Sequence, residues 1–124
     1  MSKKIIVVED SNVVQNLLKK ILSRLNYEVE SAKNGQQLID MMSNSTYDLI
    51  LLDINMPVMD GMECAKSIRA MDDAQKDVPI IAITGNAKNY TKKDFKAVGI
   101  NSVVPKPLDY DFLIEQVKKF ASDS

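Results

Sequence analysis

The sequence places acidic, hydroxyl and amino side chains at the ends of four short apolar runs. These residues are Glu9, Asp10, Asp53, Thr84 and Lys106. Carboxylates about 4 Å apart repel by a few kcal/mol at an effective dielectric constant of about 20, and each raises the pKa of the other unless a cation lies among them. A hard cation that accepts few protein carboxylates and retains water is Mg²⁺. The acidic residues therefore predict a magnesium site.

The lysine and the threonine extend this prediction to phosphoryl transfer. An ammonium group is a mobile point charge that suits one phosphoryl oxygen, and Thr84 offers a hydroxyl donor. The natural nucleophile in this set is a carboxylate. Because the chain contains no histidine, Ser-His-Asp and Cys-His catalysis and histidine zinc sites are excluded.

These side chains can act together only if the fold brings the ends of the apolar runs to one place. Short apolar or alternating runs predict five strands, at residues 5–8, 27–32, 49–53, 80–84 and 102–105. The second of these alternates and is expected to be the most exposed. Continuous apolar runs are typical of strands that are buried on both faces of a parallel sheet.

Helices are predicted between these strands from the spacing of apolar residues. The first helix has six apolar residues on one face and begins near Ser11 or Asn12, and the second follows an Asn34-Gly35 turn. A third helix begins at Gly61, and a capping box of Thr91 with Asp94 starts the fourth. The apolar anchors of the five helices are Val14, Leu17, Leu18, Ile21, Leu22 and Leu25; Leu38, Met41 and Met42; Met62, Ala65 and Ile68; Phe95 and Val98; and Leu113, Val117, Phe120 and Ala121.

The alternation of strands and helices predicts an α/β fold, a (βα)5 parallel sheet with helices on both faces. Ligands of such sheets bind beyond the carboxyl ends of the strands. Glu9, Asp10, Asp53, Thr84 and Lys106 would all lie there. Any one of them could simply be a polar loop residue, but the whole set is difficult to explain in that way.

Length and composition restrict the alternatives. The 124 residues are enough for a single domain, and 45% of them are hydrophobic. We expect a cytoplasmic protein, because no signal peptide or membrane span is evident and one cysteine, Cys64, fits a reducing compartment. Its 16 basic residues form no stripe, so no direct nucleic-acid partner is expected. Cys64 and the seven methionines are expected in the core.

The chain resembles the receiver domains of two-component response regulators, which have the flavodoxin-like fold of the chemotaxis regulator. Four motifs carry the resemblance, in this order: IIVVEDS with Glu9-Asp10, DLILLDINMPVMDGME around Asp53, PIIAITGNA at Thr84, and VVPKP at Lys106. The resemblance covers nearly the whole chain and implies a single receiver domain over residues 1–124, with strand order 2-1-3-4-5. It also implies a cis Lys106-Pro107 bond.

The resemblance also implies a role for each matching residue. Asp53 would accept a phosphoryl group from a phosphohistidine and form an aspartyl phosphate. Asp10 and Asp53 would bind Mg²⁺ through their side chains, Asn55 through its backbone carbonyl, and Glu9 through a water molecule. Pro57 would help to shape the loop after Asp53.

Two further roles concern the conformational switch that follows phosphorylation. Thr84 would hydrogen-bond the phosphoryl group and transmit the conformational change, and Lys106 would pair with the phosphoryl group. The surface of the fourth helix, fifth strand and fifth helix would then change. Val103 stands where the family commonly has an aromatic residue, and Gly85 where alanine is common. We therefore expect the loop at residues 85–88 to move more than any side chain of the fifth strand.

The resemblance implies a phosphoacceptor rather than an enzyme. Its partners would be a histidine kinase or histidine phosphotransfer protein, in a two-component pathway or phosphorelay, and an unknown downstream protein. A monomer or weak dimer without membrane contact is expected. Both a free-standing regulator and a receiver from a hybrid kinase or larger regulator remain open.

Other functions fit the residues less well. A flavodoxin-type FMN site would need a Ser/Thr/Gly loop where Glu9-Asp10 stands, and a haloacid-dehalogenase phosphatase would need Asp where Asn55 stands. A pseudo-receiver that acts only as a protein-binding module is the remaining alternative, but it would usually lack Asp10, Asp53 or Lys106.

Overall fold

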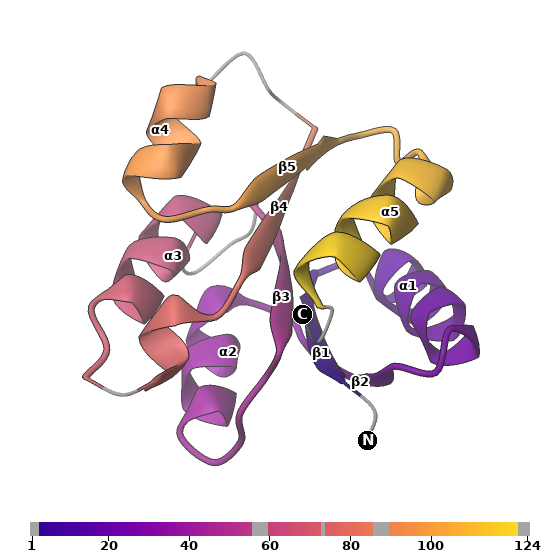
Figure 1. Cartoon of the computed structure of the whole chain (residues 1–124), viewed down its shortest axis with the longest axis horizontal. Coiled ribbons are helices and arrows are strands. Elements are labelled where there is room, and N and C mark those ends of the chain that lie inside the picture. The colour runs from indigo at the N-terminus through magenta and orange to yellow at the C-terminus, as the bar shows by residue number, and fades with distance from the viewer. Residues whose placement is uncertain (1–2, 56–59, 73, 86–89, 122–124) are drawn as a thin grey trace.

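A computed structural model describes residues 3–55, 60–72, 74–85 and 90–121 of the chain (Figure 1). Pro57 and residues 86–88, on which predictions were made above, lie outside these ranges. Five parallel strands form one sheet in the order β2-β1-β3-β4-β5. Their bounds are Lys4–Val8 for β1, Glu28–Ala32 for β2, Leu49–Asp53 for β3, Ile80–Thr84 for β4 and Ser102–Pro105 for β5. The predicted fold class and strand order are confirmed.

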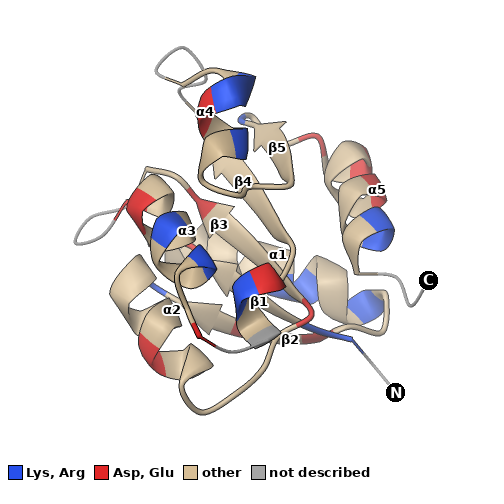
Figure 2. Ribbon diagram, turned by 60° about the vertical axis from the view of Figure 1, so that its left-hand side comes forward, with Lys and Arg blue, Asp and Glu red and all other residues tan. Residues whose placement is uncertain are grey.

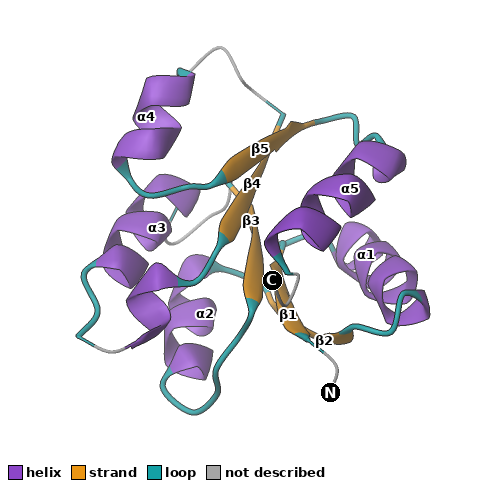
Figure 3. Cartoon of the chain, viewed as in Figure 1, coloured by secondary structure: helices purple, strands orange, loops and turns teal. Residues whose placement is uncertain are grey.

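Helices cover both faces of this sheet, as Figures 1 and 3 show. One face carries α1 (Asn12–Arg24) and α5 (Tyr110–Phe120). The other carries α2 (Gly35–Met42), α3 (Gly61–Arg69) and α4 (Lys92–Ala97). A short 3-10 helix at Ala74–Asp77, which the sequence did not predict, precedes β4. Among the described helices, none is long and apolar enough to cross a membrane.

The central strands divide their side chains between the two faces. On β1, Ile5 joins the core under α1 and α5, whereas Ile6 joins the core under α2, α3 and α4. All five residues of β3 are buried. This burial on both faces explains why the sequence runs are continuously apolar instead of alternating.

Side-chain caps begin the helices. The Ser11 hydroxyl accepts a hydrogen bond from the backbone N–H of Val14 at the start of α1. Thr91 and Asp94 form the predicted capping box of α4. The predicted Asn34-Gly35 turn is wrong, because the Asn34 side chain caps α2 directly and Gly35 is the first helical residue.

The buried face of α1 agrees with the predicted one except at Leu17 and Gln15. The spacing placed Leu17 toward the core, but this side chain is 40% exposed. The buried positions of α1 are Gln15, Leu18 and Leu22, which share one face at spacings of three and four residues. A polar side chain therefore occupies a core position of this helix.

Several smaller predictions are confirmed. The Lys106-Pro107 peptide bond is cis, and Pro105 lies in β5 at the edge of the sheet, where a missing N–H is tolerated. Cys64 is buried, and burial raises the pKa of its thiol to about 12. Among the described methionines, Met42 is buried and Met41, Met62 and Met71 pack partly buried against the same core.

Basic and acidic residues lie together on three of the helices. Figure 2 shows both kinds of charge on α3, α4 and α5. The net charge of the chain is −1. The expectation that nucleic acid is not a direct partner stays a prediction.

The start of α3 lies in close contact with the backbone just after β3, which makes Gly61 sensitive to substitution. A Cβ atom at Gly61 would lie 2.7 Å from the backbone Cα of Ile54, and the Gly61 N–H donates to the Ile54 carbonyl at 3.1 Å. We expect Gly61→Ala to lower the free energy of unfolding by about 1–3 kcal/mol, because the backbone must shift to admit the methyl group.

Gly85→Ala is the matched control for this prediction. A Cβ atom there would lie 3.5 Å from the Lys106 Cδ, an ordinary contact, so the free energy of unfolding should change by less than about 0.5 kcal/mol. Urea denaturation of both variants measures the difference. Equal stability of the two variants would contradict the close contact between α3 and β3.

Candidate functional site

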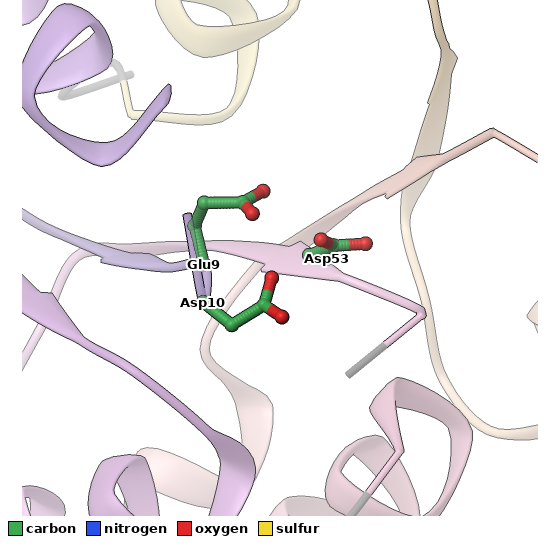
Figure 4. A group of neighbouring side chains, drawn as sticks. All are labelled: Glu9, Asp10 and Asp53. Carbon is green, nitrogen blue, oxygen red and sulfur yellow. The ribbon is translucent and has the colours of Figure 1, made fainter. Parts of the chain in front are cut away.

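Three carboxylates meet where β1 and β3 end. Glu9 and Asp10 follow β1, and Asp53 is the last residue of β3, the neighbouring strand. One carboxylate oxygen of each lies within 4.8 Å of the others. Figure 4 shows that the three side chains converge on this edge of the sheet. The predicted acidic cluster is therefore present.

Asp53 is held rigidly although it lies at a strand end. The residue is 1% exposed, and its Oδ1 accepts a hydrogen bond from the backbone N–H of Asn55 at 3.0 Å. Beyond it, the Ile54 N–H donates to the Ile83 carbonyl of β4 at 2.9 Å. The buried strand thus fixes the direction in which the Asp53 carboxylate points.

Lys106 supplies the positive charge of the cluster. Its Nζ lies 3.3 Å from Asp53 Oδ2 and 4.0 Å from Glu9 Oε2. The side chain of Lys106 is 34% exposed, whereas that of Asp53 is 2% exposed. The ammonium group therefore reaches from the solvent edge to the buried carboxylates, and one charge compensates two of them in part.

Thr84 and Asn55 lie next to this cluster. Thr84 ends β4 and is 1% exposed, and its carbonyl accepts a hydrogen bond from the Lys106 N–H at 2.8 Å. Asn55 is exposed and contacts Asp53 through its N–H. The structure thus places all six predicted site residues at one edge of the sheet, and their individual roles stay predictions.

Glu9 has a strongly raised pKa. Burial raises its pKa to about 7, the N–H of Ser11 opposes this rise, and the nearby carboxylates of Asp53 and Asp10 add to it. Its Oε1 accepts from the Ser11 N–H at 3.0 Å, whereas its buried Oε2 has no hydrogen-bond partner. A hard divalent cation that prefers oxygen ligands fits this site, because it would both satisfy Oε2 and relieve the repulsion.

Sequence reasoning missed Gln15. Its side-chain amide donates to the carbonyl oxygens of Glu9 and Ala32, each at 3.1 Å. The sequence does contain a signal for this residue, because Gln15 lies three residues before Leu18 and seven before Leu22, on the buried face of α1. A polar residue in such an apolar stripe needs a buried partner.

Comparison with known proteins identifies the family. Residues 5–118 match the family model for the response regulator receiver domain. The chain belongs to this family. Receiver domains are in general phosphoacceptors of two-component signalling and not catalysts, and they take phosphoryl groups from histidine kinases. With the acidic cluster and Lys106 all in place, the pseudo-receiver alternative is not favoured.

One similar protein is far longer than this chain. Hybrid signal transduction histidine kinase M of Dictyostelium discoideum is 41% identical over 119 residues, which are 93% of this chain and 5% of that kinase. The chain thus spans only a small part of that relative.

Two similar crystal structures contain a metal or a metal complex. The receiver domain of a sensor histidine kinase from Pseudomonas aeruginosa PAO1 has a magnesium ion coordinated in its active site cleft; it is 30% identical, with a TM-score of 0.86 and 98% of each chain covered. Response regulator protein TrrA from Thermotoga maritima, in complex with Mg²⁺ and BeF, is 35% identical, with a TM-score of 0.84 and 95% of this chain and 98% of that chain covered.

Proposed function

We propose that Asp53 is the residue that accepts the phosphoryl group. The observation that carries this proposal is the pairing of a buried, rigidly held Asp53 carboxylate with the Lys106 ammonium at 3.3 Å. No other described carboxylate combines the end of a central buried strand with a lysine and two more carboxylates.

We expect an in-line transfer from a phosphohistidine to Asp53. An oxygen of Asp53 attacks the phosphorus, the new P–O bond forms as the P–N bond breaks, and the imidazole of the donor protein leaves with the electron pair and takes up a proton. Lys106 then moves from Asp53 to a phosphoryl oxygen. The Thr84 hydroxyl donates to another phosphoryl oxygen and biases the surface of α4, β5 and α5 between two states.

The cation of this site is Mg²⁺ in our proposal. Asp10 and Asp53 would bind it through their side chains, Asn55 through its backbone carbonyl, and Glu9 through a water molecule. When bound, Mg²⁺ neutralises charge on the phosphoryl oxygens during transfer. The support from this chain is the cluster of three carboxylates and the buried Oε2 of Glu9, which accepts no hydrogen bond.

Binding of Mg²⁺ should be linked to a proton on Glu9. The folded pKa of about 7 lies above the ordinary value of 4.5, so the folded metal-free protein retains a proton that the unfolded chain has lost. Stability of the metal-free protein should therefore fall as the pH rises from 4.5 to about 7. Mg²⁺ needs the charged carboxylate, so its affinity should rise with pH over the same window.

Calorimetric titration with MgCl₂ in buffers of different ionisation enthalpy measures this linkage. We expect proton release at about pH 6 and almost none at about pH 8. Glu9→Gln, which cannot ionise, should abolish the release at the lower pH. A wild-type protein that binds Mg²⁺ equally well at both values without proton release would contradict the raised pKa.

We infer that the chain is one receiver domain over residues 1–124 that acts in the cytoplasm as a phosphoacceptor, not as an enzyme with a separate substrate. Its donor would be a histidine kinase or a histidine phosphotransfer protein. Phosphorylated donors of both kinds, mixed with the chain and Mg²⁺, test this function. We expect the phosphoryl group of at least one donor to be transferred to the chain. Failure of every donor, and of acetyl phosphate, to label the chain would refute it.

A further inference from the structure

We propose that Gln15 is a positioning residue that fixes the peptide unit between Glu9 and Asp10 and so sets the geometry of the cation site. This inference rests on the proposed metal site and adds a residue from α1 that no family motif above contains. Gln15 does not contact the cation in this proposal. It acts through the backbone that carries two of the ligands.

The Gln15 side chain is buried and directed at the end of the sheet. The residue is 7% exposed. Its Nε2 donates to the Glu9 carbonyl oxygen and to the Ala32 carbonyl oxygen at 3.1 Å each. Both donors of one amide group are thus used, and they join α1 to the ends of β1 and β2.

The carbonyl that Gln15 holds belongs to the peptide bond between Glu9 and Asp10. The preceding peptide unit is held at the same place, because the Glu9 N–H donates to the same Ala32 carbonyl at 3.0 Å. Because a peptide unit is planar, fixing its oxygen also fixes the direction in which the backbone enters Asp10. The exposed Asp10 side chain depends on this backbone for its place beside Asp53.

The other buried positions of α1 are the apolar residues Leu18 and Leu22. The polar amide at Gln15 is matched instead to the two carbonyl groups that accept its hydrogen bonds. Residues that orient the ligands of a metal site typically change its affinity by 10–100-fold when they are replaced. A purely structural residue would instead lower stability without a selective effect on the metal.

Gln15→Met tests the inference, because methionine has a similar length and no donor. We expect the Mg²⁺ dissociation constant, measured by NMR titration of the backbone amides of Asp10 and Asp53, to rise by about tenfold. The Mg²⁺ concentration that gives half-maximal phosphorylation by acetyl phosphate should rise by the same factor. Leu22→Ala, a core truncation in the same helix, is the control for lost stability and should leave both values within about twofold.

A measurement on the wild-type protein does not depend on the folding of any variant. The side-chain amide signals of Gln15 should shift during the MgCl₂ titration with the same midpoint as the Asp10 backbone amide. Side-chain signals that do not respond, or equal weakening of Mg²⁺ binding in Gln15→Met and Leu22→Ala, would overturn the inference. Wild-type protein that binds no Mg²⁺ would overturn the proposed metal site as well, whereas normal wild-type binding with an unaffected Gln15→Met variant would overturn this inference alone.

Discussion

Asp53→Asn is expected to remove phosphorylation almost completely. The substitution keeps the size of the side chain and an oxygen that can accept from the Asn55 N–H, the bond that Asp53 Oδ1 makes at 3.0 Å. It removes the nucleophile, because an amide oxygen does not attack phosphorus at a useful rate. Loss of a covalent nucleophile lowers rates by roughly 10³-fold or more. Intact-mass spectrometry after incubation with acetyl phosphate and Mg²⁺ should therefore show one added phosphoryl group in the wild type and none in the variant.

Two controls make this result specific. Asp60→Asn removes a charge from the same side of the molecule but keeps a side chain that can cap α3, the role of Asp60, so it should be phosphorylated normally. Urea denaturation should show that Asp53→Asn is folded. Equal phosphorylation of wild type and Asp53→Asn would move the acceptor to another carboxylate, with Asp10 as the first candidate because it lies in the same cluster.

Much of the fold was predictable because the central strands β3 and β4 are buried on both faces. The predicted strands at residues 49–53, 80–84 and 102–105 have the observed bounds. Continuous apolar runs that end abruptly in a polar residue leave little choice of boundary. The 3-10 helix at Ala74–Asp77 had no such signal, because its four residues AQKD show no apolar period.

Local chemistry explains the errors at the helices. Asn34-Gly35 is a common turn pair, but the Asn34 side chain accepts from the Gln37 N–H at 2.8 Å and therefore caps a helix. On α1, hydrophobicity alone placed Leu17 inside and gave no role to Gln15. The partners of Gln15 are the carbonyl oxygens of Glu9 and Ala32, and the apolar periodicity of the sequence does not reveal them.

The composition of the site was predictable, but its energetics were not. The carboxyl ends of parallel strands meet at one edge, so the convergence of Asp10, Asp53 and Lys106 followed from their positions after the strands. How deeply each of these side chains is buried could not be predicted from those positions. Glu9 is 3% exposed and Asp10 is exposed, although they are neighbours. The burial of Glu9 is what raises its pKa to about 7.

Replacement of Lys106 should change metal binding and phosphorylation in opposite directions. The ammonium group lies 3.3 Å from Asp53 and 4.0 Å from Glu9, where it competes with a cation for the same carboxylates. Lys106→Met keeps much of the length of the side chain without the charge. Mg²⁺ should therefore bind several-fold more tightly, since a partly exposed ion pair contributes at most about 1 kcal/mol.

The same variant should be phosphorylated about 10²-fold more slowly, because it lacks the charge that holds a phosphoryl oxygen during transfer. It should also fail to show the full set of beryllofluoride-induced NMR shifts in α4, β5 and α5. Lys33→Met is the matched control: Lys33 follows β2 at the same edge of the sheet, so its loss removes an equal charge without touching the cluster. Weaker Mg²⁺ binding in Lys106→Met would contradict the competition between Lys106 and the cation for the carboxylates. A wild-type rate of phosphorylation would show that Lys106 does not contact the phosphoryl group during transfer.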